Sequence, residues 1–164
     1  ICMLHNQIEG GKMARTNVFQ VANYFIKKSL DEDEGSDLTP LKLQKLCYYA
    51  QGIYLAMHDG ELLFDEKIQA WMHGPVSPDL YRCFSGSEPI IGLIKPNKYK
   101  CDLLPDDVKN LLDDVYEQFG QFSAWALRNM THKEAPWKDN WRKDKTHIVI
   151  PTDDMKKYFQ TLIG

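Results

Sequence analysis

Long apolar runs and paired cysteines are both missing from this chain of 164 residues. No apolar run approaches the roughly 18 residues that a membrane span needs, and the first residues lack the basic start and apolar core of a signal peptide. The four cysteines, Cys2, Cys47, Cys83 and Cys101, form no C-x-x-C pair, which is typical of reduced thiols. These absences predict a cytoplasmic protein without a membrane span or a structural disulfide.

An excess of one charge and the glycine motifs of nucleotide-binding proteins are absent as well. The net charge is −3 and acidic and basic residues are interspersed, so no basic stripe is available to neutralise nucleic-acid phosphates. Neither G-x-x-x-x-G-K-[ST] nor G-x-G-x-x-G occurs. A chain of this length buries roughly 70% of its unfolded surface, which suffices for a core without metal. We expect no cofactor, no metal and no direct contact with nucleic acid.

The chain does contain two helix starts of the same design, Thr39-Pro40 and Ser77-Pro78. In each, a hydroxyl side chain can cap the helix, and proline takes the first helical position, where its missing N–H has no intrahelical partner to lose. An apolar residue before each cap can pack on the fourth helical position. The expected pairs are Leu38 with Leu43 and Val76 with Tyr81.

The helix that follows Pro40 is predicted to have one broad apolar face. Apolar residues recur there at steps of three and four: Leu43, Leu46, Cys47, Ala50, Ile53, Tyr54 and Met57. Polar residues fill the rest of the helix surface. We therefore expect a core helix with one solvent-exposed side that carries Lys42, Gln44, Lys45 and Gln51.

Between Glu61 and Met72 the apolar residues change to a mostly even spacing, which predicts an extended segment with one buried edge. The expected buried residues are Leu62, Phe64, Ile68, Ala70 and Met72. A tight turn is predicted at 73–76, because glycine permits unusual backbone angles and the following proline biases it toward an extended conformation.

Further helices are expected around this core. Their signals are an apolar stripe from Asn17, a helix opened by Pro105 and closed by Gly120, a cap at Ser123, and a last helix capped by Thr152. We predict a mainly α fold, α+β at most: a compact single-domain helical bundle with a small extended or β element near 61–73 and 147–150. The domain is expected to span residues 13–164, after a flexible leader of residues 1–12.

Three strings of this chain resemble a known family. They are Leu43-Gln44-Lys45-Leu46 running into Tyr48-Tyr49-Ala50-Gln51, then Ala70-Trp71 with Gly74-Pro75-Val76 and Tyr81, and finally Thr131-His132-Lys133-Glu134-Ala135-Pro136-Trp137. In this order they are similar to the signature of the Panacea domain, also called SocA-like antitoxin or phage-associated GepA-like protein. The resemblance extends from about Asn17 to Phe159. It implies an antitoxin or adaptor that acts by binding a partner protein.

The segments 71–81 and 131–137 each combine a histidine, a proline and large aromatics at a junction between expected elements, and rigid loops that present aromatics are common sites of recognition. We expect a partner-binding surface at Trp71, His73, Gly74, Pro75, Val76, Thr131 and His132. Within it, His73 and the Gly74-Pro75 turn are expected to be exposed, and Tyr81 and Trp137 mainly to pack the junctions. The remaining motif residues are expected to be structural: Thr39, Pro40, Gln44, Tyr48, Gln51, Ser77, Pro78, Tyr81, Pro136 and Trp137.

Each possible chemical site has a structural alternative that carries more weight. His73, Ser77 and Asp79 lie close together as a catalytic trio would, but Ser77 suits a cap and Asp79 suits a helix N-terminus. The histidines 58, 73 and 132 and the cysteines lack the short spacings of zinc motifs. Trp125, Trp137 and Trp141 could form a platform for bases, but without basic neighbours they are expected in the core or at an interface.

Two classes of function remain open at this point. The first is a protein-binding module that neutralises a cognate toxin, encoded by an adjacent gene, either by direct contact or by presenting it to a cytosolic protease of the Clp type. The second is a small hydrolase or transferase that uses His73 or His132 as a general base. A phage-encoded regulator of another host protein is a milder variant of the first. The sequence favours the first class and a protein that is not an enzyme.

Overall fold

A computed structural model describes residues 13–32 and 37–163 of the chain. The predicted leader of residues 1–12 lies outside the described residues, as does part of the acidic run between Asp31 and Asp37. Across the described ranges the fold comprises seven α-helices, one 3-10 helix and a two-stranded sheet. The mainly α prediction is therefore confirmed. None of these helices combines the length and the apolar character that a membrane crossing requires.

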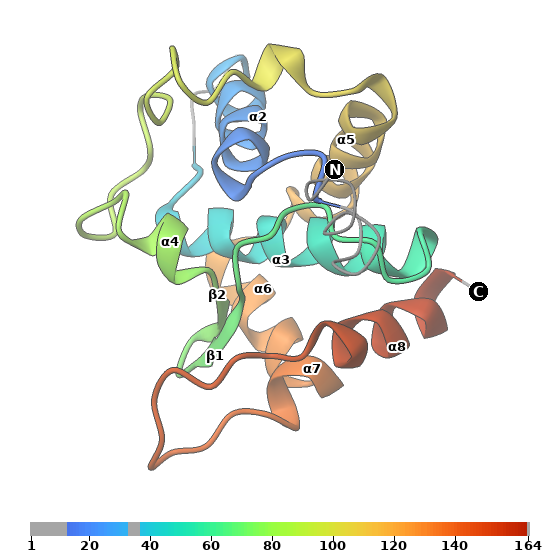
Figure 1. The fold of residues 1–164 in the computed structure, drawn as a ribbon. Coiled ribbons are helices and arrows are strands. Elements are labelled where there is room, and N and C mark those ends of the chain that lie inside the picture. Colours follow the sequence, from blue (N-terminus) through green and yellow to red (C-terminus); the bar gives the residue numbers. More distant parts are fainter. Residues whose placement is uncertain (1–12, 33–36, 164) are drawn as a thin grey trace, which may run out of the picture.

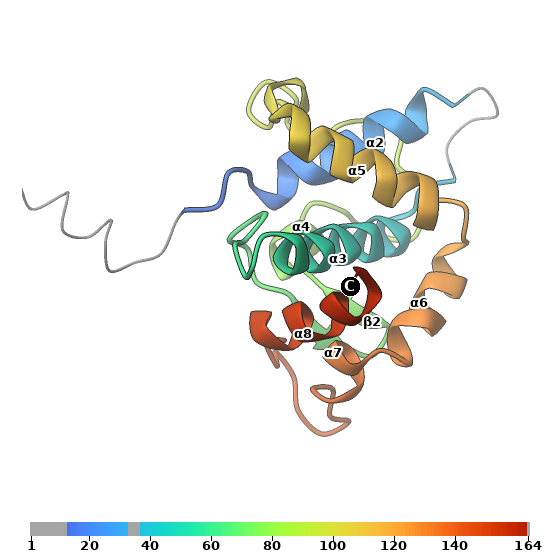
Figure 2. The same ribbon diagram turned by 90° about the vertical axis from the view of Figure 1, so that its right-hand side faces the viewer.

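The helices form two layers around a central helix, α3, which runs between them (Figure 1). Helices α2 and α5 cover one side of α3, and helices α6, α7 and α8 cover the other, as Figure 2 shows from the side. In chain order the elements are α2 (Val18–Leu30), α3 (Pro40–Met57), β1 (Gln69–Trp71), β2 (Gly74–Val76), α4 (Pro78–Tyr81), η1 (Cys101–Leu103), α5 (Asp106–Phe119), α6 (Ala124–His132), α7 (Ala135–Lys138) and α8 (Thr152–Ile163).

Most of the predicted helix starts are confirmed by capping hydrogen bonds. The Thr39 side chain accepts from the N–H of Lys42 (3.3 Å), and the Ser77 side chain accepts from the N–H of Leu80 (3.3 Å). Asn17 and Ser123 cap α2 and α6 in the same way. The cap predicted at Thr152 is wrong by one position, because Thr152 is already the first residue of α8.

The predicted solvent-exposed side of α3 is wrong, because its polar residues are buried and bonded to distant backbone. Gln44 Nε2 donates to the Ser77 carbonyl (3.0 Å), and Gln44 Oε1 accepts from the Ser77 N–H (2.8 Å). Gln51 holds the segment at Leu63 and Phe64 in the same two-sided way. A side-chain amide offers one donor and one acceptor, so each glutamine satisfies backbone groups that burial would otherwise leave unpaired.

Helix α8 lies unusually close to α3 at Gly52. A Cβ atom at this position would lie 2.1 Å from Cε2 of Phe159, well inside van der Waals contact. The Phe159 ring also packs edge-on against Tyr48, with 5.5 Å between ring centroids. The missing side chain of Gly52 therefore sets how closely the two helices approach.

The extended segment after α3 forms less regular structure than its spacing predicts. Strands β1 and β2 form an antiparallel hairpin of three pairs, with Trp71 opposite Gly74. One further bridge joins Gln69 to Val149, so the expected strand at 147–150 reduces to a single β-bridge. Phe64, Ile68 and Ala70 are buried as predicted, but Met72 is 64% exposed because it lies in the hairpin turn.

Candidate functional site

The turn of the hairpin presents Met72 and His73 to solvent. Gly74 follows with φ of 111°, a backbone conformation that residues with a side chain rarely adopt. A Cβ atom at this position would lie 2.7 Å from Cε of Lys45 and 2.8 Å from Oγ1 of Thr131. The turn therefore sits directly on α3 and α6. Its exposed residues are presented by a backbone that cannot shift far.

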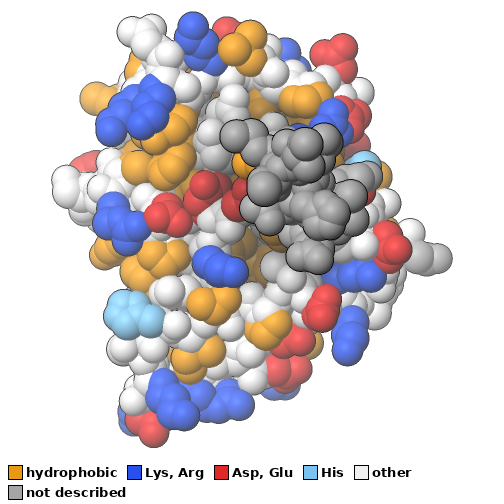
Figure 3. Space-filling model, viewed as in Figure 1, with side chains coloured by type: hydrophobic (Ala, Val, Ile, Leu, Met, Phe, Trp, Pro, Cys, Tyr) orange, Lys and Arg blue, Asp and Glu red, His pale blue; other side chains and the backbone are white. Residues whose placement is uncertain are grey.

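An apolar groove of about 500 Å³ opens beside this turn, and we call it the hairpin groove. Tyr81 is 56% exposed at its rim, because α4 ends after one turn. Figure 3 shows hydrophobic side chains gathered at the edge of the molecule where α4 and the hairpin lie. The groove is lined by Thr39, Pro40, Leu41, Gln44, Trp71, Met72, His73, Val76, Tyr81, Phe84, Ser85, Gly86, Ser87 and Ala124, which include no carboxylate.

The aromatic wall of the groove is held by hydrogen bonds. The Trp71 ring packs edge-on against Tyr81, with 4.9 Å between centroids, and its Nε1 donates to Oε1 of Gln69 (2.9 Å). The Trp71 carbonyl accepts from Nε1 of Trp137 (2.6 Å). Because both the ring and the backbone of Trp71 are anchored, its ordering costs little entropy when a partner binds.

The exposed aromatic surface continues from the groove onto α6. The His73 ring lies 5.8 Å from the Trp125 ring, and the Arg128 guanidinium stacks over Trp125 at 4.4 Å from its centroid. Trp125 is 54% exposed. Exposed Trp, Tyr and Met side chains together with a half-buried Arg resemble the composition found at the centres of protein interfaces.

The predicted partner-binding residues divide into two groups. His73 is exposed as predicted, and half-buried Trp71 and buried Val76 line the hairpin groove. The predicted exposure of the Gly74-Pro75 turn is wrong, because both residues belong to β2 and are buried against α3 and α6. Thr131 is also buried, and His132 is half-buried.

The predicted packing role of Tyr81 is wrong as well, because 56% of this residue is exposed. The expected helix after Ser77 is only one turn long, and Tyr81 is its last residue. Tyr81 therefore forms no buried pair with Val76 and instead stands at the rim of the groove. Trp137, by contrast, is 7% exposed, as its predicted packing role requires.

The string from Thr131 to Trp137 forms a buried polar junction rather than an exposed site. His132 stacks on Trp137 with 3.7 Å between centroids, and burial with the nearby positive charge of Arg128 lowers the pKa of His132 to about 4. Glu134 accepts hydrogen bonds from the hydroxyls of Tyr48 (3.0 Å) and Tyr49 (2.8 Å). Burial raises the pKa of Glu134 to about 7, although these hydrogen bonds act against the rise.

A second ionisable group is buried in the same part of the core. Lys45 is fully buried, and its Nζ donates to the Pro75 carbonyl (3.1 Å), so it ties α3 to the hairpin. Burial lowers the pKa of Lys45 to about 7, and the positive charge of Arg128 lowers it further. A desolvated ammonium is costly without a carboxylate partner, which explains the direction of this shift.

The geometry does not assemble the catalytic trio. The Ser77 hydroxyl accepts the capping bond of α4, and the Asp79 carboxylate pairs with Arg82 (2.7 Å). Neither side chain is paired with His73, whose ring instead meets Trp125. Among the described residues, no group of histidines, cysteines and carboxylates could hold a metal ion.

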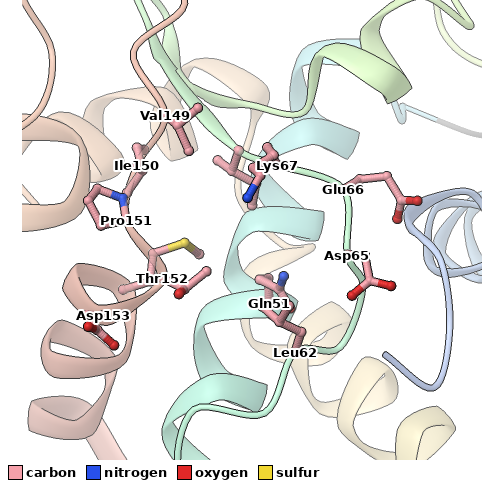
Figure 4. Close-up of a pocket in the computed structure, with 12 residues that line it drawn as sticks. Gln51, Leu62, Asp65, Glu66, Lys67, Val149, Ile150, Pro151, Thr152 and Asp153 are labelled. Atoms are coloured by element: carbon pink, nitrogen blue, oxygen red, sulfur yellow. The ribbon is translucent and has the colours of Figure 1, made fainter. Parts of the chain in front are cut away.

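A smaller hollow of about 280 Å³ lies between α3, the segment after it and the start of α8 (Figure 4). Carboxylates from Asp65 and Asp153 lie on opposite sides of it, as Figure 4 shows. Two of its polar groups are already engaged, because Gln51 holds Phe64 and Glu66 accepts from the N–H of Val18 (2.8 Å). The hairpin groove is the better candidate for a protein interface, since its exposed lining is mainly apolar.

Comparison with known proteins agrees with the motif strings. Residues 43–138 match the model of the family "Antitoxin SocA-like, Panacea domain". The chain belongs to this family. It is 32% identical over 129 residues to "Antitoxin SocA" of Caulobacter vibrioides (strain NA1000 / CB15N), a match that covers 71% of this chain and 66% of that protein. The chain thus spans about two thirds of the relative's length. No solved structure matches it.

Sequence reasoning missed several members of this surface, among them Met72, Phe84 and Arg128. Even spacing placed Met72 on a buried edge, although the two-residue turn of the hairpin exposes it. Phe84 and Arg128 carry no local signal, because they join the surface only when α4 and α6 fold against the hairpin. Trp125 was weighed as a core or interface residue, and the structure places it beside His73.

Proposed function

We propose that this protein is an antitoxin that binds a cognate toxin, encoded by an adjacent gene, through the hairpin groove. The observation that carries the proposal is an apolar groove with exposed Tyr81 and Met72 on its rim and an anchored Trp71 in its wall. Large, rigid aromatic side chains supply most of the binding energy at protein interfaces. Family membership and the name of the relative support a toxin as the partner.

Two outcomes of binding are compatible with this surface. The antitoxin either blocks the toxin directly or delivers it to a Clp-type protease. Toxin half-life distinguishes them: direct blocking leaves the bound toxin stable, and delivery shortens its half-life only in cells that contain the protease.

The first experiment is co-expression of this chain with the product of the adjacent gene, followed by purification and a growth assay. We expect a stoichiometric complex and rescue of growth, because control of a toxin requires high occupancy at cellular concentrations. Rescue of growth without a physical complex would contradict direct binding.

The second experiment tests whether the toxin binds at the hairpin groove. Tyr81→Ala and His73→Ala should leave the melting temperature nearly unchanged, since both side chains are exposed. We expect Tyr81→Ala to weaken toxin binding by at least about tenfold, as truncation of an interface hot spot does. Leu103→Ala in η1, at a position 72% exposed, is the matched control and should bind as the parent does. Equal binding by all three variants would remove the groove from the interface.

A further inference from the structure

The lining of the hairpin groove carries no formal charge of its own. None of the residues that line it is Asp, Glu, Lys or Arg. Its His73 end continues through Trp125 to Arg128, which makes the guanidinium the nearest formal charge along this path of rings. An apolar groove that ends at a cation is suited to a partner that carries both an apolar side chain and a carboxylate.

Arg128 is also the residue of this surface with unused hydrogen-bonding capacity. Its Nη1 donates to the neutral amide of Asn129 (3.0 Å), while its buried Nε has no acceptor within the described part of the chain. Arg15 and Arg82, in contrast, each bond to a carboxylate, Asp107 and Asp79. No ion pair joins the Arg128 guanidinium to a carboxylate of the described residues, so its remaining N–H groups can bond to a carboxylate that a partner supplies.

Among the described residues, the groups behind Arg128 supply no negative charge to balance it. Lys45 and the neighbouring His132 both lie close enough to Arg128 for its charge to act on them. Nε2 of His132 is buried and lacks a partner among residues 13–32 and 37–163. No carboxylate is among the groups whose charge acts on Lys45 or His132. A cationic site without an internal counter-ion favours an anion supplied from outside.

We propose that the hairpin groove recognises an acidic protein segment, whose large apolar side chain enters the groove beside the packed rings of Trp71 and Tyr81 while a neighbouring carboxylate pairs with Arg128. This inference rests on the proposed function, because it assigns a chemistry to the segment of the toxin that the groove binds. The aromatic anchor supplies affinity, and the carboxylate fixes the direction of the bound segment.

The test is a display selection from random peptides of about twelve residues, a length that allows an extended segment to cross such a groove. The full chain is the bait, and Arg128→Glu, Arg128→Gln and Tyr81→Ala serve as variant baits. Lys157→Glu on α8 is the matched control, because it makes the same change in charge at an exposed position away from the groove. Thermal melts confirm that each bait is folded.

We expect peptides selected on the parent to pair a large apolar residue with Asp or Glu. The dissociation constant of the best peptide should rise at least about tenfold on Arg128→Glu, and by a similar factor when its acidic residue is changed to the amide. Changing that residue to Lys should restore binding to Arg128→Glu. Selection on Lys157→Glu should match the parent.

Neutral or basic peptides, acidic peptides that bind Arg128→Glu undiminished, or no enrichment over Tyr81→Ala would each overturn the proposal. A concentration-dependent dimer that Tyr81→Ala abolishes would instead assign the groove to a second copy of the chain. The selection uses no toxin, so its failure is separate from a failure of toxin binding. A toxin that binds Tyr81→Ala undiminished contradicts the proposed function even if acidic peptides are selected.

Discussion

At the scale of single residues, the three motif strings are bonded to one another. Gln44 of the first string forms two hydrogen bonds with the backbone of Ser77, and Lys45 of the same string donates to the carbonyl of Pro75 in the second string. Trp137 of the third string donates to Trp71 in the second. Residues that the sequence separates by as many as 86 positions, Tyr48 and Glu134, therefore belong to one network. Of these bonded residues, Gln44 and Trp71 line the hairpin groove, and Lys45 and Trp137 bond to the hairpin without lining the groove.

The capping residues give the first prediction at this scale. Thr39→Ala and Ser77→Ala should each lower the free energy of unfolding by on the order of 1 kcal/mol, because each removes the acceptor of a capping bond. Pro40→Ala should change it little, since no intrahelical hydrogen bond is at stake at the first helical position. Urea unfolding of the three variants tests this, and equal, negligible effects at Thr39 and Ser77 would contradict it.

Trp137 and Tyr81 are both motif aromatics, yet they should respond oppositely to truncation. Trp137→Ala should cost about 3 to 5 kcal/mol of stability, because it removes a buried ring that stacks on His132 and a bond to the Trp71 carbonyl. Tyr81→Ala should cost well under half of that, since its ring is 56% exposed. Denaturant unfolding of both variants is the measurement, and similar losses would show that Tyr81 is a core residue after all.

At the scale of elements, the sequence predicted what depends on local chemistry. Helix starts at Asn17, Thr39 and Ser77 follow from side chains that bond to backbone three residues away, so the sequence alone reveals them. Burial of the polar side of α3 could not be predicted, because Gln44 and Gln51 owe their partners to loops that fold over them. Helical periodicity distinguishes the polar face of a helix from its apolar face, but it does not reveal whether a polar side chain is buried against another segment.

The surface itself was only partly predictable for the same reason. Trp71 and His73 were assigned to it because they lie in an aromatic, proline-containing junction, and both of them line the groove. Tyr81 was expected to pack the junction and to pair with Val76, and its exposure at the end of the one-turn helix α4 reverses that assignment. Where an element ends is set by tertiary contacts as much as by its first turn.

The contact between α3 and α8 gives a prediction about two elements together. Gly52→Ala should destabilise the fold by about 1 to 3 kcal/mol, the usual cost of overpacking, because its new methyl group meets the Phe159 ring. Phe159→Leu alone should also destabilise it, since it removes a buried ring. In the double variant the smaller leucine side chain at position 159 relieves the clash with the new methyl group. The loss of stability in the double variant should therefore be smaller than the sum of the losses in the two single variants. Strictly additive losses in a double-mutant cycle would contradict this packing.

At the scale of the whole molecule, the junction of α3 with the hairpin and α7 holds two buried titratable groups, Lys45 and Glu134. Each is bonded to neutral partners, a carbonyl in one case and tyrosine hydroxyls in the other. Burial therefore shifts the pKa of each toward its neutral form, and both values reach about 7 from opposite directions. Stability should consequently depend on pH through both groups.

The last prediction follows from the signs of these two shifts. Between about pH 7 and 10.5 the unfolded chain holds a proton that folded Lys45 has released, so the Lys45 contribution to stability rises with pH. Between pH 4.5 and about 7 folded Glu134 holds a proton that the unfolded chain has lost, so its contribution falls as pH rises. The two contributions together have a minimum near pH 7, with a limiting slope of about 1.4 kcal/mol per pH unit for each group.

Urea unfolding at pH 5, 7 and 9 measures both contributions as differences from the parent. Lys45→Met should lack the rise between pH 7 and 9, and Glu134→Gln should lack the fall between pH 5 and 7. Between pH 5 and 7 each variant must be compared with the parent, because His132 also contributes to the pH dependence of stability. Its lowered pKa, about 4, makes stability rise with pH up to 6.5, which opposes the fall caused by Glu134. If the free energies of unfolding of Lys45→Met and the parent change in parallel from pH 7 to 9, Lys45 keeps its charge inside the fold. A buried charge of this kind requires an anionic partner at the junction beneath the hairpin.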